Sequence, residues 1–254
     1  MNFGHTTYYL VTGASRGIGL ALVTKLLESR PDAFVFATTR VNSADLNKLH
    51  ESFPTALRIL TLNVEDESQY ASLTDEIKGL TDRLDYVIAN AGLMVGLQDC
   101  LTIPPSQLLD AIKVNTCGPL YLYQATHALL TSSTRGGRAR PPVFLITSSG
   151  AGCISASPGI PVGAYGTSKA AVNMLAREMH LQNEETGLVV SPYHPGWLQT
   201  DMGNRAAEAA HLSEAPHTLK EGVEAMIDLL DKANREEHGG KFLAYGIPGG
   251  ALPW

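Results

Sequence analysis

Seven short apolar runs recur along the chain, and segments with helical periodicity separate them. Strands that are apolar almost throughout are typical of a parallel sheet that helices cover on both faces. Because crossovers between parallel strands are right-handed, this alternation predicts an α/β fold, a Rossmann-type doubly wound parallel sheet of about seven strands. The runs occupy residues 8–13, 33–39, 57–64, 84–92, 142–149, 188–196 and 241–247.

The chain length and composition fit one such sheet. With 254 residues, we expect a single domain over 1–254. The polar stretch at 132–142 is predicted to be a surface loop, since the strand after it must return to the same sheet. The net charge is −6 and no basic block is present, which argues against nucleic acid and anionic membranes as partners.

The cysteines and the N-terminal segment bear on the compartment. Cys100, Cys117 and Cys153 are odd in number and scattered, so we expect reduced thiols. The start of the chain lacks a basic segment followed by a long apolar one, and no apolar run is long enough to span a membrane. These features predict a cytoplasmic protein.

The stretch LVTGASRGIG at 10–19 follows the first apolar run, where an open parallel sheet binds nucleotides. We expect Gly13 to end the strand tightly, Gly17 to let a phosphate approach the main chain, and Gly19 to let the next helix pack on the sheet. The helix N-terminus then offers N–H groups to a pyrophosphate. The spacing differs from G-x-G-x-x-G, and a glycine-rich turn needed only for packing is the simpler alternative. The predicted cofactor contacts here are Gly13, Ser15, Arg16, Gly17, Ile18 and Gly19.

Tyr165 and Lys169 are four residues apart, so on a helix they share one face. A tyrosine hydroxyl ionises near pH 10. A lysine ammonium one turn away, together with a cationic nicotinamide, would favour the phenolate. The simpler alternative is a surface pair on an ordinary helix. Ser148 and Ser149 end the strand upstream, where a hydroxyl could bind a substrate carbonyl or only form a turn.

These motifs resemble those of the short-chain dehydrogenases/reductases, from Tyr8 to about Gly246. The resemblance includes Asn90-Ala91-Gly92, where the family usually has one more Asn, Val114-Asn115 in a long helix, and the segment from Pro195 to Met202. The stretches ITSSGAG, AYGTSKAA and the final ALPW are similar to fungal ketoreductases of aromatic polyketides, of the norsolorinic acid ketoreductase type.

The resemblance implies catalytic roles at matching positions. Tyr165 would protonate the carbonyl oxygen, and Lys169 would hold the nicotinamide ribose and tune Tyr165. Ser149 would orient the carbonyl, whereas Ser148 would be structural. Asn115 would hold a water beside Lys169 and complete a proton relay; a buried Asn that caps main chain in a kinked helix stays open as the simpler interpretation.

The resemblance also implies cofactor contacts beyond the glycine turn. Asn90 and Gly92 would line the ribose side, and Asn63 and Val64 would bracket the adenine. Leu198 and Thr200 would contact the nicotinamide and the phosphates. The further cofactor contacts that the resemblance implies are Tyr165, Lys169, Pro195 and Gly196.

Two arginines bear on the choice of cofactor. Dinucleotide folds that prefer NAD usually place an acid at the end of the second strand. Here that run ends in Thr39-Arg40, with no acid before Asp45. Arg40 can bind a 2′-phosphate with a planar fork of donors, and Arg16 can approach it from the other side, which implies NADP(H). Taken alone, Arg16 would be an ordinary basic residue of a glycine turn.

The loop before Tyr165 departs from the family's pattern. Ser149 and Tyr165 are sixteen positions apart, a few more than is commonest, so the loop at 153–163 is predicted to build part of a substrate pocket. The extra length of this loop also puts the position of Ser149 in question.

Cys153 is interpreted as a small buried residue, and His194 as a hydrogen-bonded strand-end residue rather than a catalytic base. No histidine pair has metal-ligand spacing, so no metal is expected.

The favoured function is NADPH-dependent reduction of a ketone to an alcohol, on an aromatic polyketide-like small molecule of secondary metabolism. The alternatives are an NAD-dependent alcohol dehydrogenase and a non-catalytic, nucleotide-binding regulatory protein.

Helical segments at 120–130 and after Tyr165 predict a homodimer or homotetramer, as the family commonly forms. Residues 202–218 are predicted to form a mobile, helix-containing flap.

Overall fold

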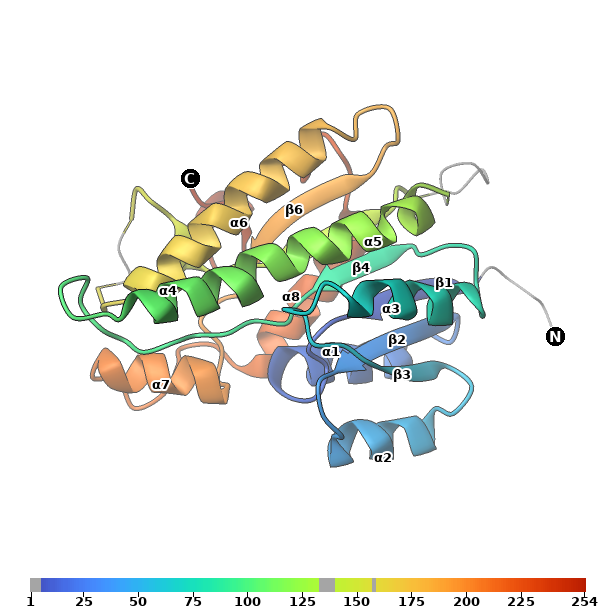
Figure 1. Ribbon diagram of the computed structural model, residues 1–254, viewed down its shortest axis with the longest axis horizontal. Helices are drawn as coiled ribbons and strands as arrows, with labels where there is room; N and C mark the ends of the chain where they lie inside the picture. The colour runs from blue at the N-terminus through green and yellow to red at the C-terminus, as the bar shows by residue number, and fades with distance from the viewer. Residues whose placement is uncertain (1–5, 133–139, 157–158) are drawn as a thin grey trace.

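The computed structural model describes residues 6–132, 140–156 and 159–254, and Figure 1 shows its central sheet between helices. The sheet has seven parallel strands in the order β3-β2-β1-β4-β5-β6-β7. The strand order reverses direction between β1 and β4, which confirms the predicted doubly wound sheet. The strands are β1 (Thr7–Val11), β2 (Ala33–Thr39), β3 (Leu57–Thr61), β4 (Tyr86–Ala89), β5 (Val143–Thr147), β6 (Val189–His194) and β7 (Leu243–Ala244).

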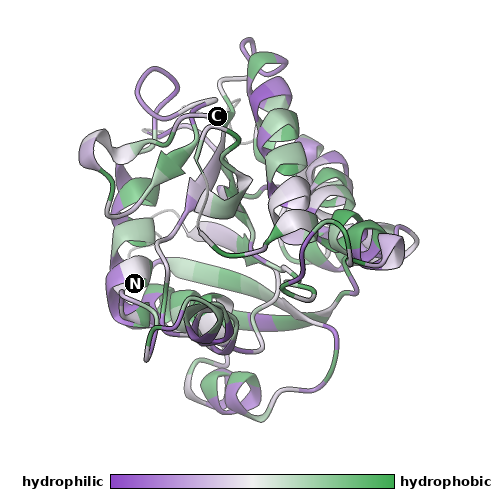
Figure 2. Cartoon of the chain, turned by 90° about the vertical axis from the view of Figure 1, so that its left-hand side faces the viewer, coloured by the Kyte–Doolittle hydropathy of each residue, from purple (hydrophilic) through white to green (hydrophobic). Residues whose placement is uncertain are grey.

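Helices cover both faces of the sheet, as the apolar strands predict. Tyr9 and Val11 of β1 pack with α1 and α8, whereas Leu10 between them packs with α3, α5 and α6 on the other face. Figure 2 shows strands that are mostly hydrophobic and helices of mixed hydropathy. The helices are α1 (Gly17–Ser29), α2 (Ala44–Ser52), α3 (Gln69–Lys78), α4 (Pro105–Ile112), α5 (Gly118–Ser132), α6 (Gly163–Leu181), α7 (Asp201–Ala209) and α8 (Leu219–Lys232).

The helical segment between β4 and β5 is interrupted where sequence suggested a kink. A π-helical turn over Lys113–Cys117 joins α4 to α5, and the fully buried Asn115 lies within it. Turns of this kind are rare and frequently occur at functional sites. The turn directs Asn115 toward the loop after β4.

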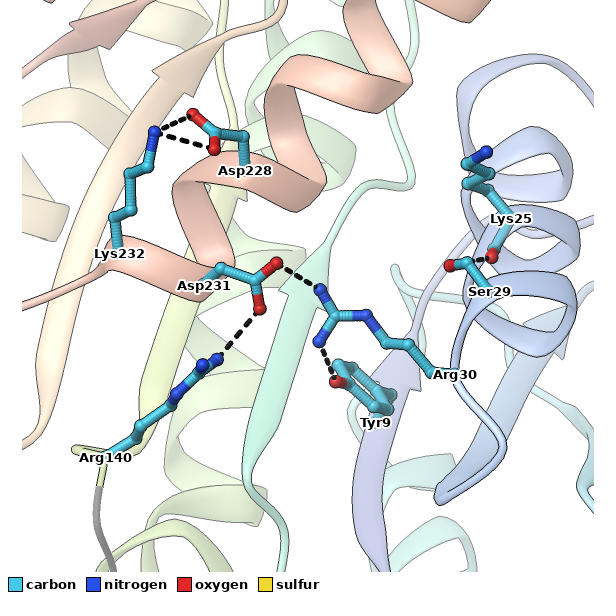
Figure 3. Close-up of polar contacts among 8 residues, drawn as sticks. All are labelled: Tyr9, Lys25, Ser29, Arg30, Arg140, Asp228, Asp231 and Lys232. Atoms are coloured by element: carbon cyan, nitrogen blue, oxygen red, sulfur yellow. Dashed lines mark hydrogen bonds and ion pairs between the residues drawn. The ribbon is translucent and has the colours of Figure 1, made fainter.

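The amino edge of the sheet is held by a charged cluster (Figure 3). Asp231 of α8 accepts hydrogen bonds from Arg30 at 2.7 Å and from Arg140 at 2.8 Å, and Arg30 also donates to the Tyr9 hydroxyl at 3.0 Å. The cluster ties the ends of α1 and α8 to the segment before β5.

Three predicted segments lie partly outside the described residues. The parts outside are 133–139 of the surface loop, 157–158 of the loop before Tyr165, and 1–5 of the N-terminal segment. No helix in the described ranges is both long and apolar enough to cross a membrane.

Candidate active site

A cavity of about 610 Å³ opens at the carboxyl edge of the sheet, where doubly wound folds bind ligands. The turn after β1, the ends of β2, β4, β5 and β6, and the first turns of α6 and α7 form its walls. Gly19, Asn63 and Asn115 do not line it. The predicted site residues that do are Gly13, Ser15, Arg16, Gly17, Ile18, Arg40, Val64, Asn90, Gly92, Ser149, Tyr165, Lys169, Pro195, Gly196, Leu198 and Thr200.

The glycines of the turn after β1 are needed for close approach. Gly13 has φ of +68°, and a Cβ there would lie 2.8 Å from the Cα of Ala91. A Cβ at Gly19 would overlap the Gly13 carbonyl oxygen and lie 2.7 Å from the Asn90 amide nitrogen. Gly19 therefore lets α1 pack against the strand ends, as predicted, which explains why it lies behind the cavity wall.

Asn90 and Thr12 join the ends of β1 and β4. The Asn90 amide donates to the carbonyl oxygens of Thr12 at 3.0 Å and Gly13 at 3.3 Å. The Thr12 hydroxyl accepts from the main-chain nitrogens of Asn90 and Ala91. Asn90 thus braces the glycine turn in addition to lining the cavity. Thr12 is not among the predicted site residues, although a polar residue at the end of an apolar strand is a signal that could have identified it.

Tyr165 and Lys169 lie on one face of α6, as their spacing predicts. The Lys169 ammonium is 5.7 Å from the Tyr165 ring centroid and donates to the Thr147 carbonyl oxygen at 2.7 Å. Burial lowers the pKa of Lys169 to about 8. Burial also raises the pKa of Tyr165, while a hydrogen bond with the Ser149 hydroxyl lowers it. The expected joint effect of lysine and nicotinamide on the pKa of Tyr165 stays a prediction.

The extended loop leaves Ser149 beside Tyr165. Both residues line the cavity, and Ser149 acts to lower the pKa of Tyr165. The Ser149 hydroxyl accepts from the main-chain nitrogen of Ala151 at 3.2 Å. Ser148 is buried and donates to the Asn173 amide oxygen at 2.5 Å, which fits the structural role implied for it. Cys153 is 5% exposed, as its interpretation as a small buried residue requires.

The Asn115 side chain is bound to protein groups. Its amide nitrogen donates to the Leu93 carbonyl oxygen at 2.7 Å and the Ser168 hydroxyl at 2.9 Å, and its oxygen accepts from the Leu93 nitrogen at 2.7 Å. A Cβ at Gly92 would lie 3.5 Å from that oxygen and 3.7 Å from the Lys169 nitrogen. The structure thus bears out main-chain capping by Asn115, and its part in a proton relay stays a prediction.

The two arginines occupy different surroundings at the cavity rim. Arg16 forms an ion pair with Asp201 of α7 at 2.7 Å, with the two side chains 76% and 79% exposed. This contact joins the glycine turn to α7. Arg40 is exposed and has no hydrogen bond or ion pair within the part of the chain that the structure describes. Its guanidinium is therefore free to bind a ligand.

The turn after β3 differs from expectation. Asn63 accepts a long hydrogen bond from its near neighbour Glu65 at 3.5 Å and lies outside the cavity. Leu62, Val64 and Glu65 line the cavity instead. Of the predicted pair, Val64 lines the cavity and Asn63 does not, and contact of either residue with adenine stays a prediction.

The segment after β6 anchors α7 beside the cavity. The Thr200 hydroxyl caps α7 by accepting from the Gly203 nitrogen at 3.0 Å, and the Trp197 indole donates to the Gly203 carbonyl oxygen at 2.8 Å. Gln199 donates to the carbonyl oxygen of Ala215 at 3.2 Å. The predicted flap at 202–218 does contain a helix, whereas its mobility stays a prediction.

The expectation for His194 is wrong in one respect. Its carbonyl oxygen accepts from the Tyr245 nitrogen at 2.9 Å, as suits the end of a strand. Its ring, however, has no hydrogen bond to any described residue, and Nδ1 is buried without a partner. Sequence could not show this, because the hydrogen bonds of the ring depend on neighbours distant in the chain.

Among the described ranges, no group of three or more His, Cys, Asp or Glu residues could hold a metal ion.

The sheet, the glycine cradle and the grouped Ser149, Tyr165 and Lys169 define a dinucleotide-binding oxidoreductase. A family model described as short chain dehydrogenase matches residues 7–211, and the chain belongs to that family. The resemblance noted from sequence is thereby confirmed.

Two related fungal proteins are similar over nearly the whole chain. A norsolorinic acid ketoreductase of Dothistroma septosporum is 36% identical, over 98% of this chain and 92% of that protein. The norsolorinic acid ketoreductase of Aspergillus parasiticus is 31% identical, over 98% and 91%.

Solved structures of carbonyl reductases share the fold. The NADPH-bound carbonyl reductase from chicken fatty liver superimposes with a TM-score of 0.85 at 31% identity, over 99% of this chain and 100% of that one. Carbonyl reductase Sniffer of D. melanogaster gives a TM-score of 0.88 at 26% identity with the same coverage.

Proposed function

We propose that the protein is an NADPH-dependent ketoreductase that converts a ketone to an alcohol. The observation that carries this proposal is that Ser149, Tyr165 and Lys169 line one cavity, with the Lys169 ammonium 5.7 Å from the Tyr165 ring centroid. When bound, the nicotinamide cofactor supplies a hydride for the carbonyl carbon. Tyr165 gives its proton to the carbonyl oxygen, and Ser149 orients that oxygen. Lys169 binds the ribose, and Asn115 supports the relay that returns a proton to Tyr165.

The residues around the glycine turn fit a dinucleotide. Gly17 leaves open space toward Thr200, since a Cβ there would come no closer than 3.8 Å to its methyl group. Main-chain N–H groups at the start of α1 can therefore approach a pyrophosphate. Arg40, together with Arg16, would hold a 2′-phosphate, which supports NADPH over NADH. The NADPH-bound chicken relative agrees with this choice.

The substrate proposed is an aromatic, polyketide-like ketone of secondary metabolism. The cavity has many apolar lining residues, and the two ketoreductases named above are similar over nearly their full length. Among the apolar lining residues are Leu93, Met94, Ile160, Val162 and Met202.

The experiment that tests the function is NADPH oxidation by the purified protein against quinones, aryl ketones and polyketide-like ketones. Turnover of at least one carbonyl class is expected, and turnover of none would overturn the proposal.

We further propose that the chain acts in the cytoplasm as a single domain over 1–254, assembled through α5 and α6 into a homodimer or homotetramer. A sedimentation mass of 27.2 kDa, that of one chain, would contradict the assembly.

A further inference from the structure

His194 lines the cavity next to Gly150, the residue that follows Ser149. The main chain sets this place, because the Ser148 nitrogen donates to the Tyr193 carbonyl oxygen at 2.7 Å and holds the ends of β5 and β6 together. A Cβ at Gly150 would lie 3.5 Å from His194 Nε2. The Nε2 edge of the ring therefore lies alongside the residue that follows Ser149.

The ring has a defined protonation state. Burial, with a smaller contribution from the charge of His217, lowers the pKa of His194 to about 4. The ring is therefore neutral near pH 7 and carries one proton. Nδ1 is buried without a partner among the described residues, whereas Nε2 is not enclosed. Since a buried N–H without an acceptor is rare, this environment favours the tautomer that carries the proton on Nε2 and leaves Nδ1 as an acceptor.

His194 is thus an uncommitted neutral donor beside the carbonyl-binding group. The Trp197 indole, which lines the same cavity, already donates to Gly203, and the lining residues Leu93, Ile160 and Val162 have apolar side chains. A ligand oxygen next to the ring would satisfy the donor, while a ligand that covered it with carbon would leave it unpaired.

We propose that His194 Nε2–H donates a hydrogen bond to a second oxygen of the substrate, close to the reacting carbonyl. The site would then select ketones that carry a neighbouring carbonyl or hydroxyl oxygen over ketones that lack one. This inference rests on the proposed ketoreductase function and names a specificity determinant for it.

The test compares ethyl benzoylformate, whose ketone has an ester carbonyl beside it, with propiophenone, which has no second oxygen. His194→Leu removes the donor at similar volume and should raise KM for ethyl benzoylformate about tenfold, relative to any change with propiophenone. His194→Gln, whose amide nitrogen can lie close to the position of Nε2, should restore most of the loss. Gly150→Ala provides a second variant, because its methyl would cover Nε2 from 3.5 Å without altering the ring.

The outcomes separate the two proposals. Turnover of no ketone by the wild type overturns the ketoreductase function, and this inference with it. If the wild type reduces ethyl benzoylformate and KM does not rise in His194→Leu, or if His194→Gln fails to restore it, His194 is not a donor to substrate. Equal losses on both ketones overturn the inference too. If the Leu variant does not fold, as judged by its Tm, a KM for ethyl benzoylformate that stays unchanged in Gly150→Ala overturns it.

Discussion

The Lys169 ammonium lies 5.7 Å from the centre of the Tyr165 ring and is held there by the Thr147 carbonyl oxygen. Both side chains line the cavity, Lys169 being buried and Tyr165 half-buried, and the loss of solvent opposes ionisation of both groups. A neutral tyrosine beside Ser149 is the form able to give a proton. The resting site is therefore poised as an acid, as reduction of a ketone requires.

Tyr165→Phe removes only the proton donor. We expect intact folding and NADPH binding but a kcat lower by roughly 10²–10⁴-fold, the usual contribution of a positioned acid. Steady-state NADPH oxidation with the best ketone of the panel measures this, and Tyr121→Phe on α5 is the matched control. A variant that keeps more than about a tenth of the wild-type kcat would show that Tyr165 is not the acid.

The pKa of Lys169 predicts a pH dependence of cofactor binding. Because burial lowers that pKa to about 8, the cationic donor is lost as the pH rises through this value. The dissociation constant of NADPH should therefore increase above pH 8 in the wild type, as measured by fluorescence titration. Lys169→Met should bind NADPH more weakly and turn over more slowly, and its affinity should not vary across that pH range. The same pH response in both proteins would assign the titration to another group.

Sequence predicts the scaffold of this site better than its side-chain contacts. Continuous apolar runs determined the parallel sheet, and one helical turn determined that Tyr165 and Lys169 face the same way. By contrast, the Arg16–Asp201 pair joins residues 185 positions apart, and such a contact follows only from the folded path of α7. The unpaired ring of His194 and the position of Asn63 outside the cavity lining likewise depend on neighbours that no local pattern specifies.

Asp231 is expected to stabilise the fold in a pH-dependent way. Burial raises its pKa, but hydrogen bonds from Arg30 and Arg140 outweigh this and lower it. A lowered pKa means that the stabilisation is present above the unfolded value of about 4 and is lost as the pH falls through the folded value. Asp231→Asn should lower the free energy of unfolding near pH 7 by about 1–2 kcal/mol. This value already allows for screening by solvent, because the Asp231 side chain is partly exposed.

Urea unfolding near pH 7 and below about pH 3 checks the Asp231 prediction, and the two proteins should converge at the lower pH. Asp228→Asn is the control, since its pair with Lys232 is exposed and contributes less than about 1 kcal/mol. A constant difference at both pH values would mean that packing, rather than charge, explains the effect.

The segment at 202–218 is predicted to become ordered over ligand. It contributes Met202, Gly203, Arg205 and Ala206 to the cavity wall and has few large apolar side chains. Amide exchange in this segment should slow when NADPH and a ketone product bind, relative to α8 as an internal reference. Exchange that is equally slow with and without ligands would rule out a mobile flap.

Cofactor choice should depend on Arg40 more than on Arg16. Arg40 has no competing partner among the described residues, whereas Arg16 must leave or share Asp201 to bind a 2′-phosphate. That exposed pair contributes at most about 1 kcal/mol, so a phosphate can compete for Arg16. Each charge-assisted hydrogen bond to the phosphate contributes about 1.5–3 kcal/mol, which corresponds to roughly tenfold to hundredfold in affinity.

Arg40→Asp both removes the guanidinium fork and supplies an acceptor for a free ribose 2′-hydroxyl. The variant should therefore shift from NADPH toward NADH, mainly through KM, because the phosphate is remote from hydride transfer. The measurement is kcat/KM for both cofactors at one ionic strength, in the wild type, Arg40→Asp and Asp201→Asn. The last variant frees Arg16 and should strengthen NADPH binding slightly without improving NADH. An unchanged cofactor ratio in Arg40→Asp would mean that Arg40 points into solvent and that Arg16 alone selects the phosphate.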